Sequence, residues 1–142
     1  PYTTLFRSAV FDFIHSVDSI KLAEKISQEA GEISKTQEIL IQINNANEEQ
    51  KFGYSKEKVF EDFGEIIKLD NLKVVGIMNM APLGADECEL AKLFTEAKEI
   101  KNNLEKTFDY ELKELSMGMS QDYKIAARNG STMLRIGRKL FE

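Results

Sequence analysis

The chain alternates short, continuous apolar stretches with longer segments in which apolar residues recur every three or four positions. Stretches of strand length occupy residues 11–17, 38–44, 72–78, 114–117 and 132–136. Apolar residues with helical spacing connect them, over residues 20–26, 59–67, 87–107 and, more briefly, between 120 and 130. These periodicities predict five strands separated by four helices. Because each connection is long enough to cross the sheet, we expect all of the strands to be parallel.

Local signals refine this pattern. Asp18 and Ser19 precede the first expected helix, and Ser55 precedes the second, which places capping residues at both boundaries. We expect Ser120 to cap the short helix before the last strand. Residues 38–44 contain three isoleucines and a leucine in a nearly continuous run, which is typical of a strand covered on both faces. The pattern fits either an open, doubly wound sheet or part of a (β/α)₈ barrel.

Composition limits the classes of partner. The 142 residues fit one domain, with 42% hydrophobic and 30% charged residues as in ordinary globular proteins. A net charge of −5 indicates no broad basic surface for nucleic acid, and no apolar run is long enough for a membrane helix. We therefore expect neither kind of partner. The single cysteine rules out an intrachain disulfide and favours the reducing cytoplasm.

The first eight residues differ in character from the rest. Residues 1–8 resemble the translation of a sequencing-adapter oligonucleotide, which predicts that they are an artefact. The predicted domain therefore covers residues 9–142.

The candidate site lies at the ends of the last two expected strands. Ser120 offers a hydroxyl at the expected start of a helix, and Gly137 allows a ligand to approach the backbone. Arg135 lies two residues before Gly137, on the same face of its strand. Together these groups would form a cup of donors suited to phosphate. The alternatives are that Ser120 only caps a helix, that Gly137 only makes a turn and that Arg135 forms a salt bridge. We expect His15, the only histidine, at a strand end with a backbone partner.

The same residues resemble the C-terminal signature of the pyridoxal 5′-phosphate (PLP) homeostasis proteins, whose fold is the barrel domain of alanine racemase. The matching motifs are Ser-Met-Gly-Met-Ser-x-Asp at 116–122 and Gly-Ser-Thr-x-x-Arg-x-Gly at 130–137, with weaker matches at 15–18, 40–44 and 76–78. The resemblance extends from about residue 11 onward. It implies that the chain is the C-terminal portion of a (β/α)₈ TIM barrel of the alanine racemase type.

The resemblance also implies a cofactor, PLP, and a role for each matched residue. The Ser120 hydroxyl would bind the phosphate, and the backbone N–H groups of Gly137 and Arg138 would bind it as well. Arg135 would face the pyridine nitrogen. Relatives commonly have a small hydroxyl residue at position 138, and the change to arginine is compatible with a contact through the backbone.

The expected function is that of a non-catalytic PLP-binding carrier in vitamin B6 homeostasis. The resemblance implies a cytoplasmic protein with PLP and PLP-dependent apoenzymes as partners, and a monomeric full-length parent. The lysine that binds PLP covalently in that family lies before residue 11 in its pattern, so we expect this chain to be a fragment without it. The alternative is a fragment of a barrel enzyme that uses the same phosphate cup, either a PLP-dependent racemase or decarboxylase or a phosphosugar enzyme. A third possibility is a fragment with no stable fold of its own.

Overall fold

The computed structural model describes residues 9–46, 48–49 and 52–142, and it contains one five-stranded sheet. In chain order the elements are β1 (Phe13–Val17), α2 (Ile20–Glu32), β2 (Gln37–Ile43), α3 (Lys56–Ile66), β3 (Leu72–Asn79), α4 (Glu87–Phe108), β4 (Glu114–Met119), α5 (Tyr123–Arg128), β5 (Met133–Arg135) and the 3-10 turn η1 (Arg138–Phe141). The strands lie side by side in the order β1-β2-β3-β4-β5, and every neighbouring pair is parallel. The predicted alternation of parallel strands and helices is confirmed.

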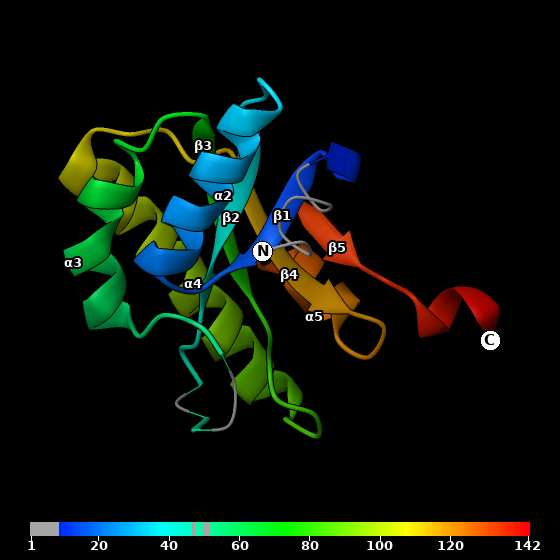
Figure 1. Ribbon diagram of the computed structural model, residues 1–142. Helices are drawn as coiled ribbons and strands as arrows, with labels where there is room; N and C mark the ends of the chain where they lie inside the picture. Colours follow the sequence, from blue (N-terminus) through cyan, green and yellow to red (C-terminus); the bar gives the residue numbers. More distant parts are fainter. Residues whose placement is uncertain (1–8, 47, 50–51) are drawn as a thin grey trace.

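The helices α2, α3 and α4 lie together on one side of the sheet, whereas η1 projects away from it (Figure 1). The main apolar core fills the space between these helices and the sheet, and β2 contributes Ile39, Ile41 and Ile43 to it. Leu40 points to the opposite face, where it packs with Val75 and Met78 of β3. The prediction that this strand is covered on both faces is confirmed. Its second face is covered by side chains of neighbouring strands, as inside a barrel.

Two of the predicted helix caps are confirmed and one is wrong. The Ser19 hydroxyl accepts a hydrogen bond from the Leu22 N–H at 3.1 Å, and the Ser55 hydroxyl accepts one from the Lys58 N–H at 3.1 Å. Ser120 caps no helix, because Asp122 is the N-cap residue of α5. The chain first makes a turn in which the Asp122 N–H donates to the Met119 carbonyl at 3.2 Å.

The two outer strands are shorter than the sequence pattern predicts. Strand β1 begins at Phe13 and β5 covers only Met133–Arg135. The predicted artefact at residues 1–8 lies outside the described residues. None of the helices in the described part of the chain combines the length and apolar character that crossing a membrane requires.

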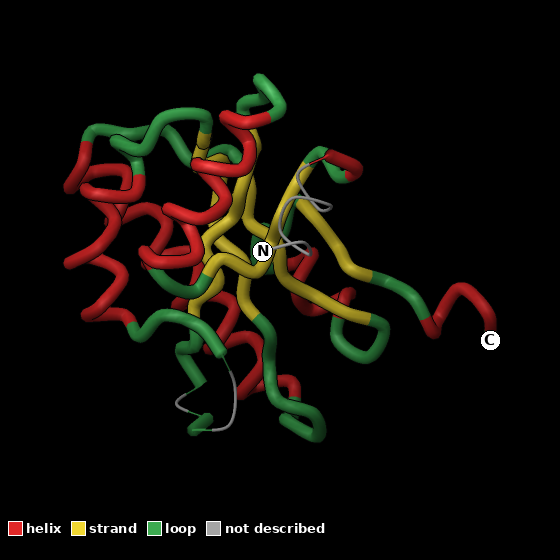
Figure 2. The backbone as a smooth tube through the Cα atoms, in the orientation of Figure 1, coloured by secondary structure: helices red, strands yellow, loops and turns green. Residues whose placement is uncertain are grey.

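The C-terminal ends of the strands and the loops that follow them meet at one end of the sheet (Figure 2). Parallel α/β folds bind their ligands at this end. The fold therefore brings the ends of β3, β4 and β5 together around the predicted site.

Candidate functional site

A cavity of about 790 Å³ lies beyond the ends of β3, β4 and β5. All four predicted site residues line it: Ser120, Arg135, Gly137 and Arg138. Its walls are otherwise mainly apolar, formed by Met80, Ala81, Leu83, Met119, Leu134 and Ile136, with Gln121 as a further polar group. No described lining residue carries a carboxylate. Apolar walls with a few polar and cationic groups suit a ligand that combines a flat ring with an anionic group.

Arg135 is held at the end of β5 by two hydrogen bonds. Its Nη1 donates to the Ser116 hydroxyl at 2.6 Å, and its Nη2 donates to the Asn79 carbonyl at 2.8 Å. Among the described residues Arg135 forms no ion pair, so the alternative of a salt-bridged strand end is wrong. Burial lowers the pKa of the guanidinium, and the negative charge of Asp122 opposes that shift. These two bonds use two of the five N–H groups of the guanidinium, so Nε–H and one N–H on each Nη have no partner among the described residues.

Ser116 and His15 belong to this arrangement, and the sequence interpretation missed both. His15 lies within β1, and its Nδ1 is 2.9 Å from the Ser116 hydroxyl oxygen. The prediction of a backbone partner at a strand end is therefore wrong. Burial lowers the pKa of His15, the charge of Arg135 lowers it further, and Glu114 opposes the shift. A signal for Ser116 was present, since it is a polar residue between apolar neighbours in a buried strand.

Ser120 connects the turn after β4 to the turn after β5. Its hydroxyl accepts a hydrogen bond from the Lys139 N–H at 3.1 Å. This bond ties η1 to the turn after β4, and Gly137 and Arg138, between β5 and this contact, line the cavity. Neither backbone N–H group of these two residues has an acceptor among the described residues. The Arg138 side chain is exposed and lies 3.7 Å from a Glu142 carboxylate oxygen, so the contribution of Arg138 to a ligand would come from its backbone.

The glycine at position 137 is required neither by the backbone nor by packing. Its φ of −123° is accessible to any residue, and a Cβ there would meet no atom within 4 Å. By contrast, Gly118 has a φ of +103°, and a Cβ there would lie 2.6 Å from the Cβ of Ala126. Gly118 is thus explained by the fold, whereas a ligand that lies close to the backbone would explain Gly137.

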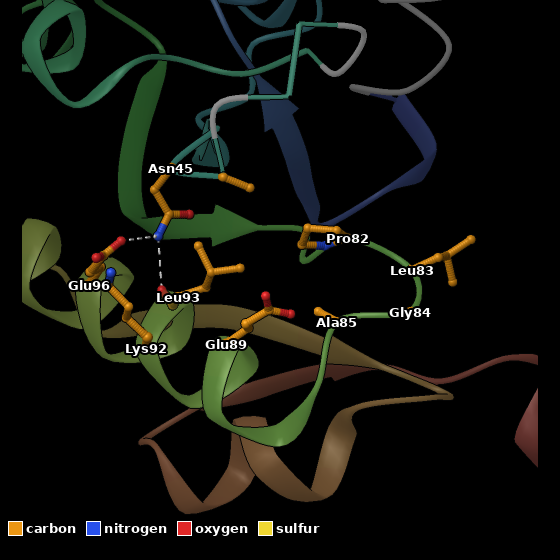
Figure 3. Close-up of a pocket in the computed structure, with 10 residues that line it drawn as sticks. Asn45, Pro82, Leu83, Gly84, Ala85, Glu89, Lys92, Leu93 and Glu96 are labelled. Carbon is orange, nitrogen blue, oxygen red and sulfur yellow. Dashed lines mark hydrogen bonds between the residues drawn. The ribbon is translucent and has the colours of Figure 1, made fainter.

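A second hollow, of about 550 Å³, lies between the loops that follow β2 and β3 (Figure 3). Three of its polar side chains already have partners: the Asn45 amide donates to the Leu93 carbonyl at 2.9 Å and to a Glu96 carboxylate oxygen at 3.4 Å, and Glu89 forms a capping box with Asp86. Because these bonds fix the start of α4 and the preceding loop, the hollow is explained as part of the scaffold. The described residues contain no group of three or more acidic, histidine or cysteine side chains able to hold a metal ion.

Comparison with known proteins agrees with the predicted resemblance. The chain is 37% identical over 131 residues to the pyridoxal phosphate homeostasis protein of Synechocystis sp., which covers 92% of this chain and 60% of that relative. It is similar to the structure of PipY from Synechococcus elongatus PCC7942 without PLP, with a TM-score of 0.94 and 32% identity over 99% of this chain and 66% of PipY. The PipY structure with PLP bound matches with a TM-score of 0.92 and 31% identity, over the same shares.

The chain thus spans less than two thirds of the length of these relatives. The parallel half-barrel nevertheless matches theirs over nearly all of its own length, which confirms the predicted fold class. Residues 3–142 match the family described as the N-terminal domain of alanine racemase, and the chain belongs to that family.

Proposed function

We propose that this chain binds PLP without a covalent bond and acts as a non-catalytic carrier in vitamin B6 homeostasis. The observation that carries the proposal is that Arg135, Ser120, Gly137 and Arg138 all line one cavity at the ends of the strands. The likeness to PipY, whose structure contains bound PLP, supports it.

The residues fit the parts of PLP. The free N–H groups of Gly137 and Arg138, together with the Ser120 hydroxyl, suit the phosphate, and the apolar walls suit the pyridine ring. Arg135 suits the ring nitrogen, because two of its five N–H groups hold the guanidinium in place and the other three, Nε–H among them, remain to donate. When bound, PLP supplies an aldehyde and an electron-withdrawing ring. A guanidinium gives up its proton very reluctantly, so the ring nitrogen next to it stays unprotonated and withdraws electrons weakly.

The composition of the cavity favours binding over catalysis. The described residues that line it include no Asp, Glu, His, Lys, Cys or Tyr. Racemases and decarboxylases need a group that moves a proton at the reacting carbon. The part of the lining that this chain supplies therefore offers groups that bind a ligand and none that transfers a proton. We further propose that the carrier works in the cytoplasm, delivers PLP to PLP-dependent apoenzymes and is monomeric in its full-length form.

Calorimetric titration of the 142-residue chain tests this proposal. The ligand is pyridoxine 5′-phosphate, because it lacks the aldehyde and cannot react with surface lysines. We expect saturable binding that Arg135→Ala weakens at least about tenfold, which corresponds to the loss of one charge-assisted hydrogen bond. Arg128→Ala is the matched control, since Arg128 is exposed on α5 and lies outside the cavity. Absence of binding to the folded chain, or equal losses in the two variants, would contradict the proposal.

A further inference from the structure

The hydroxyl of Ser116 joins two side chains that lie far apart in the sequence. Arg135 donates to it at 2.6 Å from β5, and His15 Nδ1 lies 2.9 Å from it on β1. Ser116 is completely buried in β4, so water does not complete its hydrogen bonding. All three strands therefore meet at one oxygen atom.

The direction of these hydrogen bonds follows from the chemistry of the groups. A guanidinium can only donate, so the Ser116 oxygen must accept from Arg135. The single hydroxyl proton of Ser116 has no acceptor other than His15 among the described residues, so it points to Nδ1, which then presents a lone pair. His15 is therefore neutral and carries its proton on Nε2.

Protonation of His15 would reverse one of these bonds. Both ring nitrogens of an imidazolium donate, so Nδ1 would direct a proton at the Ser116 oxygen. The hydroxyl proton of Ser116 would lose its acceptor at a buried position, where an unpaired polar group is costly. Two positive charges, on His15 and Arg135, would also converge on one oxygen. The bond from Arg135 to Ser116 is consequently weakened in the protonated state.

We propose that His15 and Ser116 are positioning residues that hold Arg135 in its ligand-binding orientation only while His15 is neutral. The proposal rests on the proposed function, in which Arg135 binds the ring nitrogen of PLP. PLP affinity would then be full at neutral pH and fall as His15 takes up a proton. By linkage, bound PLP would in turn make that proton harder to add.

The surroundings of His15 place this change below neutral pH. On β5 Arg135 lowers the pKa of His15, and burial lowers it more, from an ordinary value of 6.5. On β4 Glu114 opposes both effects. Asp122, in the turn after β4, acts on Arg135. The ring of Phe13, on β1 itself, meets the His15 ring edge-on at 6.3 Å and adds no charge.

The first measurement uses the ligand-free chain. His15 is the only histidine, so nitrogen-15 NMR shows one imidazole and distinguishes its two neutral tautomers. We expect the proton on Nε2 and a pKa below 6.5. Arg135→Gln and Ser116→Ala should both raise that pKa, because one removes a positive charge and the other removes the donor to Nδ1. A proton on Nδ1, or an unchanged pKa in Arg135→Gln, would overturn the proposal.

The second measurement is the affinity for pyridoxine 5′-phosphate between about pH 5 and pH 8. The ligand phosphate titrates in the same range, so His15→Asn serves as the reference, with an amide oxygen that can accept from Ser116 in place of Nδ1. Relative to that variant, we expect the unmodified chain to lose about fivefold in affinity on acidification. If the affinities of the unmodified chain and of His15→Asn changed with pH in the same way, the positioning role would be refuted. If the ligand binds at no pH, the proposed function fails, and the NMR result alone decides whether His15 and Ser116 position Arg135.

Discussion

Replacing Gly137 by alanine adds one methyl group, and this change tests whether the glycine is needed for folding or for ligand binding. For Gly137→Ala we expect the free energy of unfolding to change by less than ~0.5 kcal/mol, because its φ is −123° and no atom lies near the added Cβ. The methyl group would stand at the wall of the cavity, where the ligand approaches the backbone. The affinity for pyridoxine 5′-phosphate should fall about tenfold, as measured by calorimetry.

Gly118→Ala is the matched control for this prediction. Its φ of +103° and the 2.6 Å approach to Ala126 should cost ~2–3 kcal/mol of stability, measured by urea unfolding. A stability loss of the same size in Gly137→Ala, or an unchanged affinity in that variant, would show that the ligand does not approach Gly137.

The sequence identified the residues around the cavity better than it identified their local bonds. Ser120 and Asp122 are both common N-cap residues, so composition alone does not decide which of them begins the helix. The structure places the turn first: the Asp122 carboxylate accepts from the Met119 N–H at 2.6 Å, and the helix starts at Tyr123. Whether a turn or a helix begins at Ser120 depends on η1, because the Lys139 N–H donates a hydrogen bond to the Ser120 hydroxyl. A local pattern contains no information about that contact.

Among the elements, the pairing of β3 with β4 depends on one glycine. A Cβ at Gly76 would lie 2.0 Å from the Glu114 carbonyl oxygen, a backbone atom that cannot move aside without breaking the pairing. Gly76→Ala should therefore cost at least ~3 kcal/mol of stability in urea unfolding. Gly31→Ala is the control, because the atom nearest its added Cβ belongs to the flexible Asn71 side chain. Equal effects of the two substitutions would refute this explanation of Gly76.

The start of α4 provides a second prediction for an element. The Asp86 carboxylate accepts from the Glu89 N–H at 2.9 Å, and the Glu89 carboxylate accepts from the Asp86 N–H at 3.1 Å. Asp86→Ala should lower the free energy of unfolding by ~1 kcal/mol, because helix N–H groups lose their acceptor. Asp86→Asn keeps a good capping side chain and should change the thermal midpoint very little. A loss in Asp86→Asn as large as in Asp86→Ala would mean that charge, not the hydrogen bond, stabilises this end.

The elements themselves were largely predictable because their signals are local. The β-branched run of residues 38–44 and the helical spacing of residues 87–107 correspond to β2 and α4 within two residues. The outer strands were less predictable. Residues 11–12 have the alternation of a strand, but β1 begins only at Phe13, where its pairing with Glu38 starts. Pairing partners decide where an edge strand begins, and the sequence of the strand does not contain them.

For the whole molecule, contacts between residues far apart in the chain could not be predicted from the sequence. Parallel order follows from the crossover helices, and the C-terminal ends of the strands then bring Ser120 and Arg135 together. The bond between His15 and Ser116 joins residues 101 positions apart, and that between Arg135 and Asn79 joins residues 56 apart. Strand curvature and register set these contacts, so only the folded chain reveals them.

The two edges of the sheet, formed by its outer strands, lead to the last prediction, which concerns association of whole chains. Strands β1 and β5 are the first and last of the sheet, and an outer strand presents backbone groups that can pair with another chain. Exposed apolar side chains lie at both edges. Phe11, just before β1, is 52% exposed, Phe13 in β1 is 37% exposed, and Leu134 in β5 is 41% exposed. We expect the 142-residue chain to self-associate as its concentration rises, measured by sedimentation velocity.

Phe13→Lys should shift that association to higher concentration about tenfold, because a lysine at a sheet edge disfavours pairing and removes apolar contact. Phe52→Lys is the matched control: Phe52 is 79% exposed, but it lies in the loop between β2 and α3, away from both edges. If the two variants associate alike, exposed phenylalanine in general drives association and the edges do not. A chain that stays monomeric at every concentration would show that neither edge is available to a partner.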